Sequence, residues 1–98
     1  MNLRVEITKE AKENLIEIGD YISIDNTAAA LSVIDSLEQL CMSLTVLSEH
    51  GSLYGYQHRR LISGRYQIVY RIDRTTDNPV VYIVAIHHTA QDIESADY

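Results

Sequence analysis

The chain has 98 residues, of which 46% are hydrophobic and 22% are charged. A chain of this length forms one domain with a modest core, and this composition is ordinary for a globular protein. No apolar run approaches the roughly 20 residues that a membrane-spanning helix needs, and the first residues lack the features of a secretory signal. We therefore expect a single domain over residues 1–98 that stays in the cytoplasm.

The formal net charge is −6, but the charges are unevenly distributed. Residues 1–53 carry three Lys or Arg against nine Asp or Glu, and residues 89–98 carry three acids. Residues 54–88 instead carry five Arg against two Asp, which gives +3. The acidic total argues against a generic nucleic-acid binder, whereas the planar donor fork of arginine suits carboxylates and phosphates. Alternatively, these arginines only cover an exposed sheet face.

The first half of the chain predicts a short strand and two amphipathic helices. Apolar and polar residues alternate from Leu3 to Ile7, as in a half-buried strand. Thr8 is a suitable N-cap for a first helix, and Asn26 or Thr27 for a second. The helical stripes are Ala11, Leu15, Ile18 and Ile22, then Ala30, Val33, Ile34, Leu37, Leu40, Cys41, Leu44 and Leu47. Helices separated by so short a break pack as an antiparallel pair.

The second half predicts three strands. Residues 48–57 have two glycines and no periodicity, so we interpret them as a loop. Ser63-Gly64 then indicates a tight hairpin turn, and Val80–Ile86 is apolar enough for an interior strand. Between this turn and the interior strand, apolar and polar residues alternate, which predicts a strand with one buried and one exposed face. The buried set is Tyr66, Ile68, Tyr70 and Ile72, and the exposed set is Arg65, Gln67, Val69 and Arg71.

These elements predict an α+β fold in which a helical hairpin packs on a mostly antiparallel four-stranded sheet, in the order β-α-α-β-β-β. The remaining residues, 89–98, form a polar and acidic tail that we expect to be partly mobile.

Few residues suggest chemistry. His50, His58, His87 and His88 lack metal-ligand spacing, and we expect neither a metal nor another cofactor. Cys41 lies on a helical stripe and is interpreted as a small core residue. Tyr66 and Tyr70 share a strand face with two isoleucines, which favours the core over a base-stacking platform.

Cleavage of RNA through its 2′-hydroxyl would need a base, an acid and cations within hydrogen-bond reach of the phosphate. Arg60, Arg65 and His88 are the candidates for such a site. Adjacent strand residues point to opposite faces, so His87 and His88 cannot both face one site on a regular strand. A structural role for the histidine is the favoured interpretation.

Three segments together resemble a known family: DNTAAALSVIDSLEQL, RRLISGRYQIVYRID and VYIVAIHHTAQDI. They resemble the ParE/RelE superfamily of bacterial type II toxin-antitoxin toxins, and are closer to its ParE branch. The similarity extends from Leu3 to about Ile93. It implies a RelE/ParE-like fold and a cytoplasmic toxin that a cognate antitoxin holds inactive. ParE-like members inhibit DNA gyrase, whereas RelE-like members cut mRNA on the ribosome.

The sequence departs from the family pattern at the end of the last strand. Related chains commonly have Arg-His-Gly-Arg-Gln-Asp, where residues 87–92 here are His-His-Thr-Ala-Gln-Asp. His87, Thr89 and Ala90 thus replace Arg, Gly and Arg. Three hypotheses follow: a ParE-like gyrase inhibitor, which we favour, a RelE-like ribosome-dependent mRNA endoribonuclease, or an attenuated toxin that acts mainly as an antitoxin-binding partner.

All three hypotheses predict binding to an antitoxin. An apolar groove beside the helices, with an arginine-bearing sheet face, would accept an amphipathic and acidic segment. The candidate residues for antitoxin or target binding are Arg59, Arg60, Arg65, Arg71, His87 and His88. This interpretation predicts that the helices pack against the last strands and that the guanidinium groups share one surface.

Overall fold

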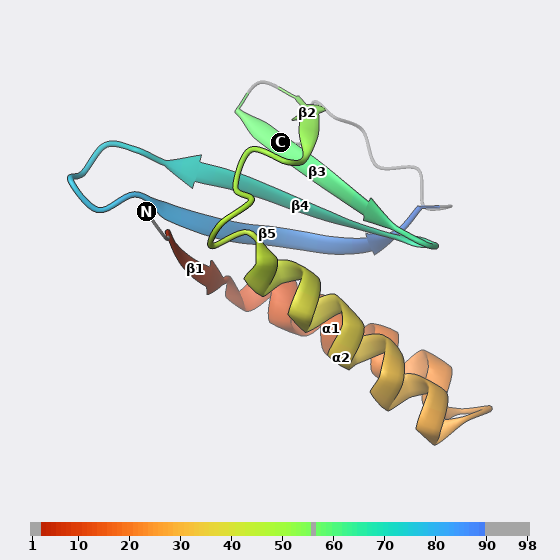
Figure 1. The fold of residues 1–98 in the computed structure, drawn as a ribbon. Helices are drawn as coiled ribbons and strands as arrows, with labels where there is room; N and C mark the ends of the chain where they lie inside the picture. Colours follow the sequence, from red (N-terminus) through yellow and green to blue (C-terminus); the bar gives the residue numbers. More distant parts are fainter. Residues whose placement is uncertain (1–2, 56, 90–98) are drawn as a thin grey trace.

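The computed structural model describes residues 3–55 and 57–89. In chain order its elements are β1 (Arg4–Ile7), α1 (Lys9–Ser23), α2 (Thr27–Ser43), β2 (Ser52–Tyr54), β3 (His58–Ser63), β4 (Tyr66–Asp73) and β5 (Val80–His88). The strands form one sheet in the order β1-β5-β4-β3-β2 (Figure 1). β1 runs parallel to β5, and the other three pairs are antiparallel.

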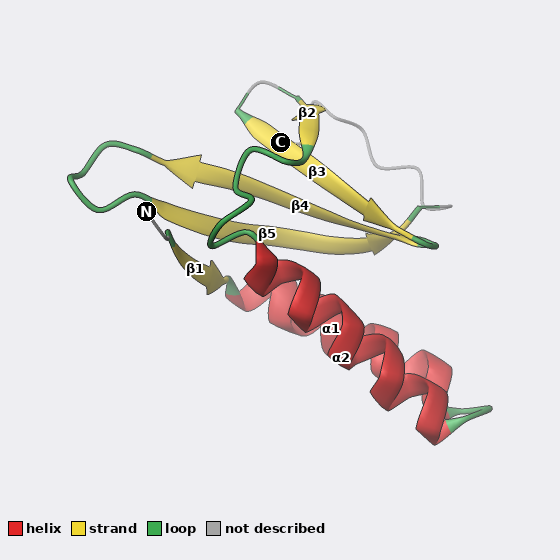
Figure 2. Cartoon of the chain, viewed as in Figure 1, coloured by secondary structure: helices red, strands yellow, loops and turns green. Residues whose placement is uncertain are grey.

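The predicted α+β class and element order are confirmed, with one additional strand. Figure 2 shows both helices on the same side of the sheet. The predicted tail, apart from its first residue, lies outside the described residues. Within the described part of the chain, neither helix is long and apolar enough to cross a membrane.

Side-chain caps fix where each helix begins. The Thr8 hydroxyl accepts a hydrogen bond from the Ala11 N–H at 3.4 Å, and the Asn26 side chain accepts one from the Ala29 N–H at 3.0 Å. Asn26 is therefore the cap of α2, which decides between the two residues that the sequence allowed. α2 ends at Ser43, one turn before the predicted apolar stripe does.

The core lies between the helices and one face of the sheet. It contains Ala11, Leu15, Leu37, Cys41, Leu44, Ile68, Tyr70, Val81, Ile83 and Ile86. Cys41 is a core residue, as predicted, and burial raises the pKa of its thiol to about 12. The thiol therefore stays protonated at neutral pH and is a poor nucleophile.

The prediction that β4 buries one face and exposes the other is wrong at the centre of the strand. Val69 is 0% exposed and Gln67 is 4% exposed, although both lie on the face away from the helices. β4 is the central strand, so neighbouring side chains reach across it. Arg60 is directly opposite Val69 and its Nη1 donates to Gln67 Oε1 at 3.4 Å.

The prediction of a continuous loop over residues 48–57 is also wrong, because β2 pairs with β3 there. β2 has three residues, which is too short for an alternating pattern to be recognised in the sequence. The following hairpin turn is centred on Gly64-Arg65, one residue later than predicted. Gly64 has φ of 57° and Arg65 does not have positive φ, as in a type II′ turn.

A buried hydrogen bond joins the segment before β2 to the middle of the sheet. The Gly51 N–H donates to Tyr70 Oη at 2.9 Å, and both residues are buried. Burial is the main cause that raises the pKa of Tyr70. Any side chain at residue 51 would collide, because an added Cβ would lie 2.5 Å from Tyr70 Oη and 2.7 Å from the Arg60 carbonyl oxygen.

We predict that Tyr70→Phe lowers the free energy of unfolding by about 1–3 kcal/mol, because it leaves the buried Gly51 N–H without a partner. Urea unfolding followed by circular dichroism measures the change. Tyr82→Phe is the matched control, and we expect a change within about 0.5 kcal/mol for this half-buried tyrosine. Equal stability of the two variants would contradict the structural importance of the bond.

Candidate functional site

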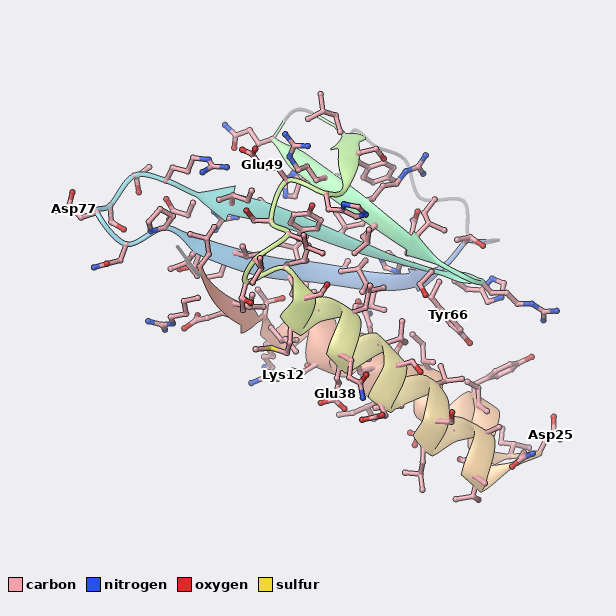
Figure 3. All side chains as sticks on the ribbon, in the orientation of Figure 1. Lys12, Asp25, Glu38, Glu49, Tyr66 and Asp77 are labelled. Carbon is pink, nitrogen blue, oxygen red and sulfur yellow. The ribbon has the colours of Figure 1, made fainter. Side chains whose placement is uncertain are left out.

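A groove of about 630 Å³ lies between α1 and the end of the sheet where β4 begins and β5 ends, next to the β3–β4 turn. Its lining residues are Asn14, Glu17, Ile18, Tyr21, Ile22, Arg65, Tyr66, Ile86, His87 and His88. Figure 3 shows Tyr66 projecting from β4 toward the helices. The groove thus combines an apolar floor with groups of both charges, which suits a peptide segment better than a bare ion.

The groove exists because the apolar stripe of α1 is only partly covered. Ala11 and Leu15, in the first half of the helix, are buried in the core. Ile18 and Ile22 continue the same stripe but are half-buried and border the groove. The sequence therefore predicted the stripe correctly, while the structure shows that its second half faces an open surface.

A β-bulge decides which residues of β5 face the helices. The register places Val69 opposite Ala85 and Tyr70 opposite Ile83, so Val84 has no partner of its own. As a result, Ile83 and Ile86 both lie in the core although they are three residues apart. Without the bulge, strict alternation would direct the next residues to the opposite faces.

The edge of β5 is bonded first by β1 and then by α1. Thr8 closes the β1 side, because its N–H and its hydroxyl both donate to the Ile83 carbonyl oxygen, at 3.0 and 2.7 Å. In the second turn of α1, Asn14 Oδ1 accepts a hydrogen bond from the Ile86 N–H at 3.0 Å. The Asn14 side chain thus replaces a strand partner and fixes α1 against the groove.

The bulge brings His88 onto the face that carries Tyr66. The two residues are opposite each other in the sheet, and their rings meet edge to face with centroids 5.4 Å apart. Tyr66 was predicted to be core, and it packs against the core, but it is only half-buried and also borders the groove. His87 also borders the groove, although its cross-strand neighbour is Gln67.

Burial lowers the pKa of His87, and the negative charges of Glu10 and Glu17 oppose this shift. Because the burial effect is larger, the imidazole is uncharged near neutral pH. The ring then offers one hydrogen-bond donor and one acceptor in place of a positive charge. This matters because an arginine at that position would be charged at any physiological pH.

Two of the candidate arginines are occupied on different faces of the sheet. Arg59 lies on the helix side, opposite Tyr70, and its Nη1 donates to the carbonyl oxygens of Gly51 at 2.9 Å and Glu49 at 3.4 Å. Arg60 lies on the other face, with its guanidinium carbon 5.0 Å from the Tyr54 ring centroid. Arg59 therefore stabilises the loop before β2, and Arg60 lies on the face of the sheet opposite to His88.

The other two candidate arginines are also apart. Arg71 stacks over Tyr82, with its guanidinium carbon 4.5 Å from the ring centroid. Arg65 is exposed in the β3–β4 turn and is the only arginine among the described residues that line the groove. The expectation that all the guanidinium groups share one surface is therefore wrong, because alternation along β3 puts Arg59 on the helix side and Arg60 on the other face, which Arg71 shares.

Sequence reasoning missed several residues of the groove. Asn14 and Glu17 looked like ordinary polar residues of an amphipathic helix, and Tyr21 carried no recognised signal. Asn14 did have a detectable feature, since it stands three residues after Ala11 and four before Ile18, at the margin of the apolar stripe. The hydrogen bond from the Ile86 N–H to Asn14 follows the bulge in β5, and no sequence pattern revealed that bulge.

The fold occurs in solved toxin-antitoxin structures. One chain comes from the crystal structure of the toxin-antitoxin complex RelBE2 from Mycobacterium tuberculosis, with a TM-score of 0.68 and 17% identity over 90% of this chain and 99% of that chain. Another comes from the chromosomal ParDE TA system from P. aeruginosa, with a TM-score of 0.70 and 16% identity over 88% of this chain and 95% of that chain. No curated protein sequence matches this chain.

The family is identified from the sequence itself. The model of the family described as "ParE toxin of type II toxin-antitoxin system, parDE" matches residues 5–93, which is most of the chain. The chain belongs to this ParE toxin family. The predicted resemblance to the ParE/RelE superfamily is confirmed, and it does not depend on the arginine surface that the structure lacks.

We predict that the His87 imidazole titrates below the ordinary value of 6.5, as measured by NMR. Because the folded pKa is lowered, the unfolded chain binds the proton more readily. The contribution of His87 to stability is therefore complete above about 6.5 and is lost as the pH falls through the folded pKa. Glu17→Gln should lower the midpoint further, since Glu17 favours the charged ring. A midpoint above 6.5 in the unmodified protein would contradict the burial of this ring.

Proposed function

We propose that this chain is the toxin of a type II pair, that it arrests growth by binding DNA gyrase, and that a cognate antitoxin neutralises it in the cytoplasm. Membership of the ParE toxin family supports the first part. The separation of Arg60 from the other two candidate ribonuclease residues, Arg65 and His88, supports the second. In this proposal the toxin acts by protein binding and catalyses no reaction.

The position of Arg60 is the observation that carries this choice. Cleavage of RNA requires acid, base and cationic groups around one phosphate. Arg60 is on the face of the sheet away from the helices, whereas His88 is on the helix side with Tyr66. Arg65 and His88 line the same groove, but Arg65 is its only described arginine, and the lowered pKa of His87 keeps that ring uncharged near neutral pH. This arrangement favours a binding surface over an endoribonuclease centre.

The groove is our candidate for the antitoxin site. Ile18 and Ile22 offer apolar contacts, and Arg65 offers a bidentate donor. A complementary segment would be amphipathic, with apolar anchors spaced for the groove and a carboxylate for Arg65. In this proposal Arg65 is the only one of the four candidate arginines that contacts the antitoxin in the groove.

We predict that purified toxin abolishes DNA supercoiling by gyrase and leaves a translated message intact in a primer-extension assay. Normal supercoiling at a large molar excess of toxin would contradict the proposal. Breaks in the message that disappear in both Arg65→Ala and His88→Ala would instead support the endoribonuclease hypothesis. Normal growth of cells that express the toxin without antitoxin would support the attenuated-toxin hypothesis.

We predict that Arg65→Glu weakens binding of the cognate antitoxin by about tenfold or more. Attraction between the guanidinium and a carboxylate of the antitoxin would be replaced by repulsion between two carboxylates. Isothermal titration calorimetry with the antitoxin encoded beside the toxin measures this change. Lys12→Glu makes the same change of charge on the exposed face of α1 and serves as the control. Equal losses in the two variants would argue against a specific contact at Arg65.

A further inference from the structure

The face of the sheet away from both helices carries no helix in the described part of the chain (Figure 2). We call it the helix-free face, and its central side chains are those of Tyr54, Arg60, Ile62, Gln67, Val69, Arg71, Tyr82 and Ala85. The uncovered face of an antiparallel sheet is usually polar. Here Val69 is 0% exposed and Ala85 is 3% exposed, while the apolar Ile62 is 53% exposed. The helix-free face thus offers apolar as well as polar contacts to a further segment.

Arg60 and Arg71 are the cations at the centre of the helix-free face. Neither takes part in the salt bridges found within the described residues. Each guanidinium instead lies over a tyrosine ring of the sheet. The carboxylate of Asp73, on the same face, accepts hydrogen bonds from the backbone and the hydroxyl of Thr75. Stacking on a ring leaves the N–H groups at the edge of a guanidinium available for a carboxylate.

Arg60 has hydrogen-bond donors that are not fully used. Its Nη1 donates to Gln67 Oε1 over a long distance of 3.4 Å. Its Nε is buried, and no group in the described part of the chain accepts a hydrogen bond from it. A buried donor without an acceptor is costly, and more so on a charged group. A carboxylate that reaches Arg60 would therefore make a favourable contact.

The chain itself supplies an acidic segment. Residues 90–98, which lie outside the described residues, have the sequence AQDIESADY. This segment carries the carboxylates of Asp92, Glu94 and Asp97 and contains neither Lys nor Arg. Its apolar residue Ile93 stands between two of these acids. The composition is complementary to a surface that has two arginines and an exposed isoleucine.

The length of this segment matches the position of the two arginines. The Thr89 N–H donates to the Arg65 carbonyl oxygen, so the segment starts at the end of β5. The strand register and spacing place Arg60 about 16 Å and Arg71 about 23 Å from Thr89. The three acids follow Thr89 by three to eight residues, which span about 10–27 Å when extended. Both arginines are therefore within reach.

We infer that residues 90–98 fold back over the helix-free face, where their carboxylates bind Arg60 and Arg71 and Ile93 packs beside Ile62. This inference does not depend on the proposed function. The segment would neutralise the two central cations of the face. It would also give the buried guanidinium of Arg60 acceptors that the described residues do not provide.

The groove is a less favourable site for the same segment. The carboxylate of Glu17 lines it, and Arg65 is the only arginine among its described lining residues. Burial lowers the pKa of His87, so this ring adds no positive charge near neutral pH. An acidic segment therefore favours the helix-free face. With that face covered, Arg65 is the candidate arginine that stays open to a carboxylate of a partner.

A nitroxide spin label attached to Ala96→Cys and detected by methyl NMR tests this inference. Cys41 is 0% exposed, so the label attaches at residue 96. We expect the methyl signals of Ile62 and Ala85 to be lost to broadening, while those of Ile18 and Ile22 in the groove are retained. In about 1 M salt, where the screening length is about 3 Å, the lost signals should return.

Two variants of the labelled chain test the charges separately. One converts the three acids of the segment to amides, as Asp92→Asn, Glu94→Gln and Asp97→Asn. The other combines Arg60→Gln with Arg71→Gln. We expect each to recover both signals of the helix-free face. Because the first variant changes no residue of the described fold, it remains informative if the second one does not fold. Circular dichroism establishes which variants are folded.

The matched control is Arg65→Gln, which removes the arginine of the groove and leaves the helix-free face unchanged. We expect the Ile62 and Ala85 signals to remain lost in this control. Loss of the Ile18 and Ile22 signals instead would place the segment in the groove and overturn the inference, as would retention of all four signals. Loss that persists after the acids are neutralised would also overturn it. Loss that weakens on dilution would assign the contact to neighbouring molecules and contradict folding back.

Discussion

The arrangement of this protein depends on how the outer edge of β5 is bonded. β1 pairs with β5 only as far as Ile83, and α1 then takes over through Asn14 and the Ile86 N–H. An unpaired backbone donor at a buried edge is costly, so this side chain replaces the missing strand. The same contact sets the position of the helical hairpin on the sheet. The bulge at Val84 lies between the two bonds and turns Ile86 and His88 toward the groove.

The distribution of arginines explains why a basic segment does not make a basic site. Five arginines lie between residues 54 and 88, but consecutive strand positions face opposite sides. The Arg59 guanidinium donates hydrogen bonds to two carbonyl oxygens, and the guanidinium groups of Arg60 and Arg71 stack on tyrosines of the sheet. Such contacts hold the guanidinium groups near the protein surface and reduce what they offer to a distant phosphate. The turn residue Arg65 is the one that reaches the groove.

Most of the fold could be predicted from sequence because its elements carry strong local signals. Helical stripes, the Thr8 and Asn26 caps and the apolar run at Val80–Ile86 each follow from residue spacing. β2 could not be predicted, because its three residues gain their structure from pairing with β3. The groove was anticipated beside the helices, and three of its polar residues, Arg65, His87 and His88, were named. The role of Asn14 escaped because its hydrogen bond to Ile86 joins residues 72 positions apart in the chain, and the bulge escaped because it arises only when β5 pairs with β4.

The shortness of the outermost strands has a consequence for the protein when it is alone. β1 has four residues and β2 has three, and the Leu3 N–H beside β1 is already bonded to the Thr45 carbonyl oxygen. Long unpaired strand edges recruit strands from other molecules and start aggregation. The outermost strands of the described sheet, β1 and β2, offer only short edges for such recruitment. Such short outer strands reduce the tendency of a free copy of this protein to aggregate through strand pairing.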